Sequence, residues 1–177
     1  RLASRHRADA PRSKFSGLLT VCEVDGTRML LLKPMTYMNL SGRSALEAVQ
    51  FYKLDPSKDL LVVVDDLALP CGTIRLKPDG SSGGHNGLSD IGLKLSSNYW
   101  ARLRIGIDAP GRVPQVDYVL GRFTPEQQPL VESAIQDAVA ASETWATRGV
   151  DEAANRFNRK AATGNPPKRN DTQAREA

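Results

Sequence analysis

The sequence predicts an α/β fold with a mixed β-sheet, and three observations carry that prediction. Strand-like and helix-like segments alternate along the chain, which is the arrangement of α/β proteins. Residues 60–64 form a continuous apolar run that ends in two carboxylates, the pattern of a strand buried on both faces. Residues 17–23 and 28–33 read as two strands joined by Asp25-Gly26, a strong hairpin signal. The hairpin makes part of the sheet antiparallel.

The remaining strands and the first helices follow from periodicity and turn residues. Ser41 is a plausible N-cap for a helix that should end near Leu54, before an Asp-Pro pair. Residues 88–95 predict a short helix that follows a glycine-rich loop. Three further segments are predicted as strands, the last at a sheet edge: residues 73–77, 101–107 and 116–120.

The strongest helix signal begins at Thr124. Thr124 as N-cap, Pro125 at the first helical position and Gln127 form a capping box with the favoured proline. Gly149 ends this helix, and a second helix is expected over about residues 150–159. The apolar stripe of the first helix consists of Leu130, Ala134, Ile135, Ala138, Val139 and Trp145.

Length and composition exclude several classes of protein. The 177 residues fit one domain, and the hydrophobic fraction of 40% is that of a globular protein. No apolar run approaches the roughly 18 residues of a membrane helix, and no signal peptide is visible. The two cysteines, Cys22 and Cys71, indicate free thiols rather than a disulfide framework, and no His/Cys cluster has the spacing of metal ligands. We expect a cytoplasmic protein without metal, cofactor or membrane contact.

The net charge of +4 is unevenly distributed. Both ends of the chain are basic and the middle is acidic, which favours contact with a polyanion. Two basic solvated tails would give the same pattern, so both interpretations stay open. From residue 161 onward glycine, proline, asparagine and charged residues dominate, and residues 161–177 are expected to be a disordered basic tail.

Asp65 and Asp66 directly follow the predicted buried strand. Ligands of open α/β sheets bind at the carboxyl ends of strands. A carboxylate there can orient a histidine, hold a metal or act as a base. A polar strand end without any function is the alternative interpretation.

The segment Ser82 to Gly87 opens the helix predicted over 88–95. Its glycines would let backbone N–H groups approach an anion, and His85 is of the residue type that most often acts as a general base. The alternative is a tight turn in which His85 and Asn86 only cap the helix. Asn39, an amide that can donate and accept, is equally consistent with an ordinary turn. Ser41 lacks the G-x-S-x-G context of a hydrolase nucleophile.

Several motifs occur together in a specific order and spacing, and in this order and spacing the chain resembles the bacterial peptidyl-tRNA hydrolase family over residues 15–158. The motifs are Lys33-Pro34-Met35-Thr36-Tyr37-Met38-Asn39-Leu40-Ser41-Gly42, Val64-Asp65-Asp66-Leu67-Ala68-Leu69-Pro70, Gly83-Gly84-His85-Asn86-Gly87-Leu88 and Arg102-Leu103-Arg104-Ile105-Gly106-Ile107. The resemblance implies a three-layer α/β/α fold and a monomer. It also implies metal-free hydrolysis of the ester between peptide and tRNA in peptidyl-tRNA.

The resemblance also implies roles for individual residues. Asp65 resembles the carboxylate that orients the catalytic histidine. Asn39 and Asn86 resemble amides that position the substrate and the attacking water. The other residues implied to contact substrate or tRNA are Tyr37 and Met38 in the pocket wall, His85 in the glycine-rich loop, and Lys77 and Arg104 near the tRNA backbone.

The chain also departs from the family pattern. We expect the family's first strand, most of its first helix and its general-base histidine to be missing, with residues 1–14 a basic remnant before a domain over 15–160. Ala68 stands where the family has a second acid. The chain as given is therefore expected to be inactive. The alternatives are a non-catalytic, splicing-factor-like RNA-binding relative and an unrelated nucleotide-binding α/β domain.

Overall fold

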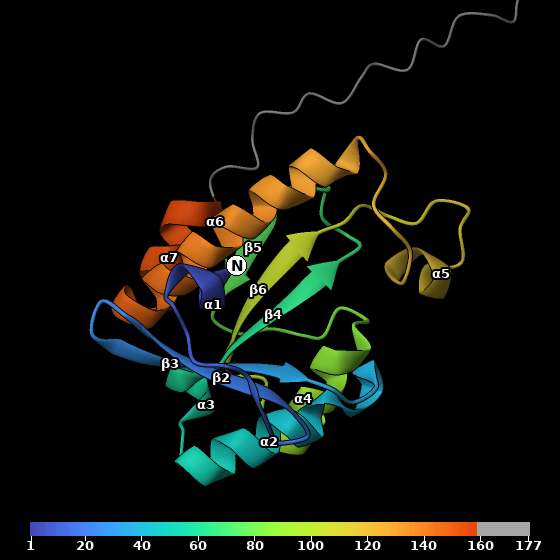
Figure 1. Cartoon of the computed structure of the whole chain (residues 1–177). Coiled ribbons are helices and arrows are strands. Elements are labelled where there is room, and N and C mark those ends of the chain that lie inside the picture. Colours follow the sequence, from blue (N-terminus) through green and yellow to red (C-terminus); the bar gives the residue numbers. More distant parts are fainter. Residues whose placement is uncertain (159–177) are drawn as a thin grey trace, which may run out of the picture.

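The computed structural model describes residues 1–158, and its six strands form two three-stranded sheets (Figure 1). The first sheet has the order β1-β2-β3 and is antiparallel throughout. The second has the order β4-β6-β5, with β4 parallel and β5 antiparallel to β6. The strand bounds are β1 (Arg12–Lys14), β2 (Gly17–Val24), β3 (Thr27–Pro34), β4 (Leu61–Asp66), β5 (Ile74–Lys77) and β6 (Ala101–Gly106).

Helices cover both faces of the second sheet. In Figure 1, α6 and α7 lie on one side of it, and α2 and α4 lie on the other. The α/β fold with a mixed sheet between helical layers is thus confirmed, although no described strand joins β3 to β4. The helix bounds are α1 (Leu2–Arg5), the 3-10 helix η1 (Met38–Leu40), α2 (Ser41–Tyr52), α3 (Pro56–Asp59), α4 (Asn86–Leu95), α5 (Gln115–Val119), α6 (Gln127–Arg148) and α7 (Val150–Phe157).

Alternation along β5 and β6 divides the core into two parts. Leu76 and Leu103, which are register partners, are 1% and 0% exposed and pack against α6 and α7. Small residues such as Ala134 and Ala138 let α6 approach the sheet closely. On the other face, the four residues of the α2/α4 cluster are buried together: Ala45, Leu88, Ile91 and Trp100.

Local sequence signals produced the expected turns at two places. Asp25 and Gly26 both have positive φ, 47° and 80°, which is the conformation that a two-residue hairpin requires. Thr124 and Gln127 form the reciprocal capping box: each backbone N–H donates to the other side chain, at 3.2 and 3.3 Å.

Three predictions of local structure were wrong. Residues 116–120 are not an edge strand, because the helix α5 begins after Pro114. The Pro114 carbonyl accepts a hydrogen bond from Tyr118 N, as in a helical turn. Ser41 is not the N-cap of α2. The carboxylate of Asp90 in α4 accepts from Gly42 N at 2.6 Å instead. Leu130, expected in the apolar stripe, is 50% exposed.

The first residues of the chain pack against α6. His6 Nε2 lies 2.7 Å from Glu143 Oε1, and Arg1 pairs with Glu132 at 2.8 Å. Residues 1–14 thus contain α1 and β1, which pairs with β2. The tail expected over 161–177 lies outside the described residues.

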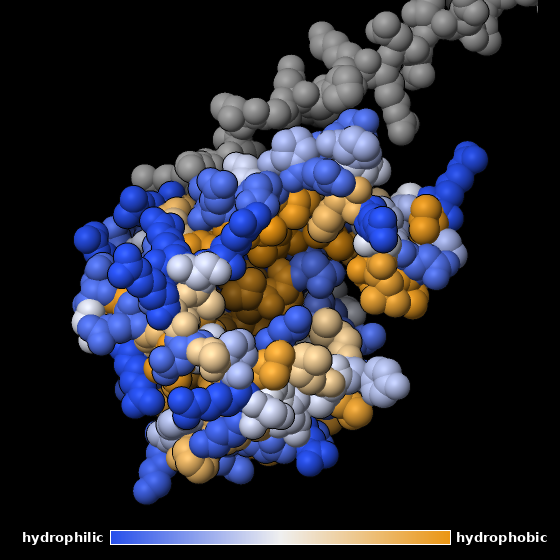
Figure 2. All heavy atoms as spheres, viewed as in Figure 1, coloured by the Kyte–Doolittle hydropathy of each residue, from blue (hydrophilic) through white to orange (hydrophobic). Residues whose placement is uncertain are grey.

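The surface view in Figure 2 shows a hollow with an apolar floor at the centre of this face. Val63 of β4 is 50% exposed even though it lies in the middle of an apolar strand, since β4 has a strand partner on one side only among the described residues. No helix within residues 1–158 is both long and apolar enough to cross a membrane.

Candidate functional site

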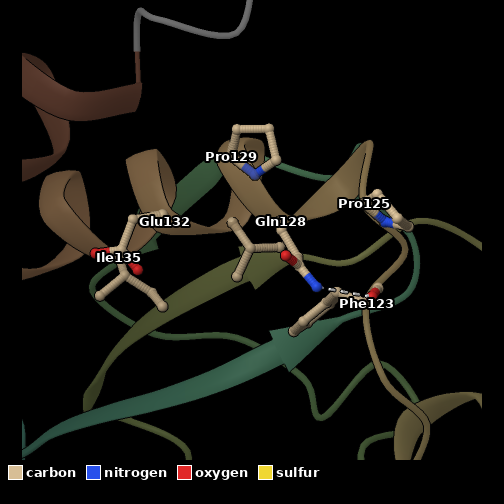
Figure 3. Close-up of a pocket in the computed structure, with 7 residues that line it drawn as sticks. Phe123, Pro125, Gln128, Pro129, Glu132 and Ile135 are labelled. Atoms are coloured by element: carbon tan, nitrogen blue, oxygen red, sulfur yellow. Dashed lines mark hydrogen bonds between the residues drawn. The ribbon is translucent and has the colours of Figure 1, made fainter.

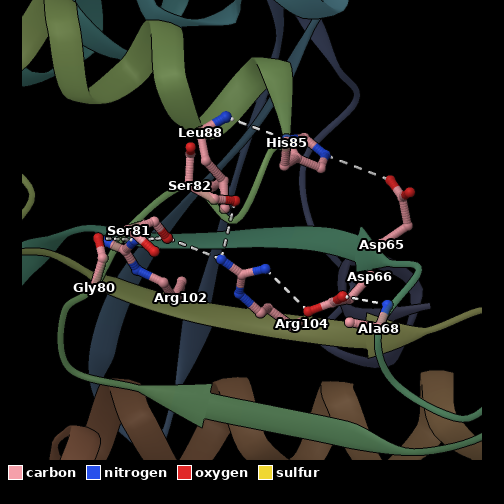
Figure 4. Close-up of polar contacts among 10 residues, drawn as sticks. All are labelled: Asp65, Asp66, Ala68, Gly80, Ser81, Ser82, His85, Leu88, Arg102 and Arg104. Atoms are coloured by element: carbon pink, nitrogen blue, oxygen red, sulfur yellow. Dashed lines mark hydrogen bonds and ion pairs between the residues drawn. The ribbon is translucent and has the colours of Figure 1, made fainter.

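The residues predicted to carry chemistry, except Lys77, lie where β4 ends, η1 turns and α4 begins. Figure 4 shows Asp65 and His85 of this group. Asp65 Oδ1 lies 3.6 Å from His85 Nε2, an ion-pair contact slightly long for a hydrogen bond. The facing His85 ring lowers the pKa of Asp65, against the partial burial that would raise it. The Asp65 carboxylate is thus kept ionised, and it is 39% exposed and accessible from solvent.

The other ring nitrogen of His85 fixes the tautomer. Nδ1 accepts from Leu88 N at 3.2 Å, which makes His85 the N-cap of α4. A neutral imidazole has one lone pair, and here the helix uses it. Nε2 therefore carries the proton that faces Asp65. In this arrangement His85 has no ring lone pair left to remove a proton from water.

The exposed segment Tyr37-Met38-Asn39 lies beside this pair. Tyr37 is 82% exposed and Met38 is 53% exposed. Met38 packs on the first turn of α4, because a Cβ added at Gly87 would lie 2.6 Å from Met38 Sδ. The side-chain amides of Asn39 and of the α4 residue Asn86 are exposed and have no hydrogen-bond partner within residues 1–158. Two free amides therefore accompany the Asp65–His85 pair.

Arg104 is bound within the protein. Its Nη1 lies 2.9 Å from Asp66 Oδ2, and its Nη2 donates to the carbonyls of Ser81 and Ser82 at 3.0 and 3.2 Å. The Arg104 and Asp66 side chains are only 13% and 11% exposed. Asp66 also accepts from Ala68 N at 2.8 Å. The side chain expected to meet the tRNA backbone thus holds the glycine-rich loop to the sheet.

Lys77, the other expected phosphate contact, is exposed at the end of β5. Its side chain forms no hydrogen bond or ion pair within the described part of the chain. It is the register partner of Arg102 in β6. The sequence interpretation missed Arg102, which is 1% exposed and donates to the carbonyls of Gly80 and Ser81. The alternation Arg-Leu-Arg around the core residue Leu103 was the signal that both arginines share one face of the sheet.

No group of three His, Cys, Asp or Glu side chains within residues 1–158 is arranged to hold a metal. A cavity of about 600 Å³ lies elsewhere, at the start of α6 (Figure 3). It shares no residue with the cluster around Asp65. Its lining consists of Phe123, Pro125, Gln128, Pro129, Val131, Glu132 and Ile135.

Sequence comparison identifies the family. Residues 1–165 match the family described as peptidyl-tRNA hydrolase. The chain belongs to the peptidyl-tRNA hydrolase family. A peptidyl-tRNA hydrolase of Rhodopirellula baltica is 45% identical over 164 residues, which are 92% of this chain and 85% of that protein. One of Alkaliphilus oremlandii is 41% identical over 157 residues, or 89% of this chain and 84% of that protein.

Solved structures of the family have the same fold. The peptidyl-tRNA hydrolase of Acinetobacter baumannii superposes with a TM-score of 0.82 at 35% identity, over 89% of this chain and 81% of that one. The prediction of the family is thereby confirmed, and the alternative of an unrelated nucleotide-binding domain is wrong. The hydrolase family also accounts for the grouping of Asp65, Asn39 and Asn86 at one end of β4.

Proposed function

We propose that this site binds peptidyl-tRNA and serves hydrolysis of the ester between the peptide and the tRNA. The observation that carries the proposal is the contact of Asp65 with His85 beside two unengaged amides. A water-attack hydrolase needs an oriented base and donors to the developing oxyanion. Asn39 and Asn86 can supply the donors, and the accessible carboxylate of Asp65 can orient a base.

The proposed contacts to substrate divide by chemistry. Tyr37 and Met38 offer exposed apolar surface beside Asn39, which suits a peptide or the terminal base of the tRNA. Lys77 offers an uncompensated ammonium for a phosphate. Arg104 could bind a phosphate only after breaking its ion pair with Asp66, since Arg104 Nη1 lies 2.9 Å from Asp66 Oδ2.

Neither described histidine is placed to act as the general base that removes a proton from the attacking water. The Nδ1 lone pair of His85 accepts a hydrogen bond from Leu88 N. His6 contacts Glu143 on α6, away from Asp65 and His85. We therefore propose that the 177-residue chain binds peptidyl-tRNA but cleaves it slowly. We also propose that it acts as a cytoplasmic monomer, which size-exclusion chromatography and localisation of a tagged chain would test.

The test is cleavage of peptidyl-tRNA by the purified chain, with a full-length relative alongside and with added imidazole as an exogenous base. We expect little cleavage alone, and a rise with imidazole that the Asn39→Ala variant does not show. That variant separates rescue at the site from the cleavage by imidazole in solution. A rate equal to that of the relative without imidazole would refute the assignment of the base.

The unused cation at Lys77 and the absence of a free histidine at the cluster also favour a second function, RNA binding without hydrolysis. Under that alternative the chain binds tRNA, but imidazole does not restore cleavage above that of the Asn39→Ala variant. The two functions thus give opposite results in the same assay.

A further inference from the structure

Arg102 is a buried cation that the proposed function leaves unexplained. It is the second residue of β6, is 1% exposed, and forms no ion pair with a carboxylate within residues 1–158. Its guanidinium donates instead to backbone carbonyls, to Gly80, to Ser81 at 3.0 Å and to Asn98 at 2.8 Å. Burial and the nearby Arg104 lower the pKa of Arg102. Burying a cation without a carboxylate partner carries a desolvation penalty, which indicates that Arg102 has a specific structural role.

The surroundings of Arg102 suit a guanidinium in particular. Its Cζ lies 3.9 Å from the centroid of the Trp100 ring, which is fully buried and held by a bond from its Nε1 to Ser97 O at 2.9 Å. The planar group is thus stacked on an aromatic face while its two terminal nitrogens point at carbonyls. A lysine ammonium cannot reproduce the stacking and the fork together.

The carbonyls that Arg102 binds belong to the loop before His85. Arg102 holds Gly80 and Ser81, Arg104 holds Ser81 and Ser82, and the carbonyl of Ser82 accepts from His85 N at 3.2 Å (Figure 4). The three consecutive carbonyls of residues 80–82 are therefore anchored, and only Gly83 and Gly84 separate them from the histidine.

The same loop has little stiffness of its own. Gly80, Gly83 and Gly84 have φ values of 141°, 59° and 84°, and glycine populates many other conformations as readily. Anchoring from β6 is thus what selects one conformation of the loop.

A second connection runs through the core. Trp100, on which Arg102 stacks, belongs to the buried cluster that contains Leu88 and Ile91 of α4. The backbone N–H of Leu88 is the donor to His85 Nδ1. Arg102 therefore supports the segments on both sides of His85.

We propose that Arg102 is a positioning residue, which fixes residues 80–84 so that the His85 ring faces Asp65. The proposal deepens the proposed function and rests on it for its catalytic meaning, because Arg102 forms no hydrogen bond with Asp65, His85 or either of the two amides. Its structural content can be tested without substrate.

The test is NMR of the full chain carrying Arg102→Met or Arg102→Lys, with Arg75→Met as the matched control. Arg75 lies on β5 opposite Arg104, is exposed, and forms no hydrogen bond or ion pair with the loop. The chain has only two histidines, so the His6 signals serve as an internal reference for those of His85. The carboxyl signal of Asp65 reports its titration.

In Arg102→Met we expect the ring signals of His85 to shift and broaden while those of His6 stay in place. We also expect the pKa of Asp65 to rise toward its ordinary value, since the facing His85 ring is what lowers it. Arg102→Lys should lie between this variant and the wild type, and the control should match the wild type. A folded Arg102→Met variant with unchanged His85 and Asp65 signals would overturn the proposal.

Backbone relaxation of the wild-type chain keeps the proposal testable if the Met variant does not fold. We expect amide order parameters near about 0.85 for residues 81–84, as in rigid secondary structure. Values below about 0.6 would show that the arginines do not fix the loop and would refute the proposal. If these NMR results hold and the chain shows no hydrolysis with imidazole, the positioning role stands and the proposed function fails.

Discussion

Replacing Asp66 by Asn tests whether the pair with Arg104 is structural. The substitution keeps the size of the side chain but removes the negative charge, and it leaves one acceptor oxygen for the two donors Ala68 N and Arg104 Nη1. Arg104 then stays 13% exposed with two carbonyl acceptors but no counter-ion. A nearly buried cation without a carboxylate should destabilise the folded state.

The geometry sets the size of the effect. Unit charges at the observed 2.9 Å attract by about 6 kcal/mol at an effective dielectric constant of about 20, and desolvation offsets much of this. Removing one partner of a buried pair costs about 3–5 kcal/mol. Because the one amide oxygen of Asn cannot accept from both Ala68 N and Arg104 at the observed positions, we expect Asp66→Asn to lower the free energy of unfolding by about 3–5 kcal/mol.

The assay is urea unfolding followed by tryptophan fluorescence, with Glu47→Gln as control. Glu47 pairs with Arg43 at the same 2.9 Å, but the side chains are 35% and 71% exposed. Exposed i,i+4 pairs contribute about 0.3–0.5 kcal/mol, and the substituted glutamine keeps an acceptor for the Ser16 hydroxyl that also binds Glu47 at 3.2 Å, so the control should lose only about that much. Equal losses in the two variants would refute the argument that burial makes the Asp66–Arg104 pair structural.

Three further predictions concern stability. The His85 contact lowers the pKa of Asp65, so ionised Asp65 stabilises the fold above its unfolded pKa, and this contribution is lost as pH falls through the folded pKa. Asp65→Asn should therefore flatten the decline of Tm below about pH 5. Asn158 exchanges two 2.8 Å hydrogen bonds with the backbone of Leu76 in β5, so Asn158→Ala should cost about 1–3 kcal/mol in urea unfolding. Leu103 is fully buried against α6, and Leu103→Ala should cost about 2–5 kcal/mol by thermal or urea unfolding.

Sequence reasoning succeeded where a structure depends on neighbouring residues alone. The Asp25-Gly26 turn and the Thr124–Gln127 box are short-range devices, and both formed as predicted. It failed at residues 116–120, where Pro114 was a local helix-start signal that the strand prediction overlooked, and at the start of α2, where the deciding partner is distant in sequence. The Asp90 carboxylate that caps α2 lies 48 residues beyond Gly42, and no local pattern marks it.

The candidate site shows the same division. The family resemblance brought together Asp65, His85 and Asn86, and the structure places them side by side. It did not show that His85 Nδ1 would be used to cap α4, because the donor of that bond, Leu88 N, belongs to the backbone. Backbone groups carry no sequence signature, so the protonation state of His85 could be inferred only from the structure.

The two basic residues that the resemblance assigned to tRNA differ in the same way. Their sequence contexts, Leu76-Lys77 and Leu103-Arg104, are alike, since each follows a buried leucine on a strand of the same sheet. Of the two, Arg104 lies under the glycine-rich loop, and its guanidinium is bound to Asp66 and to carbonyls of that loop. Lys77 lies at the end of β5 without such a neighbour. A phosphate that approaches this face would therefore meet a ready cation at Lys77 and would have to compete with a carboxylate at Arg104.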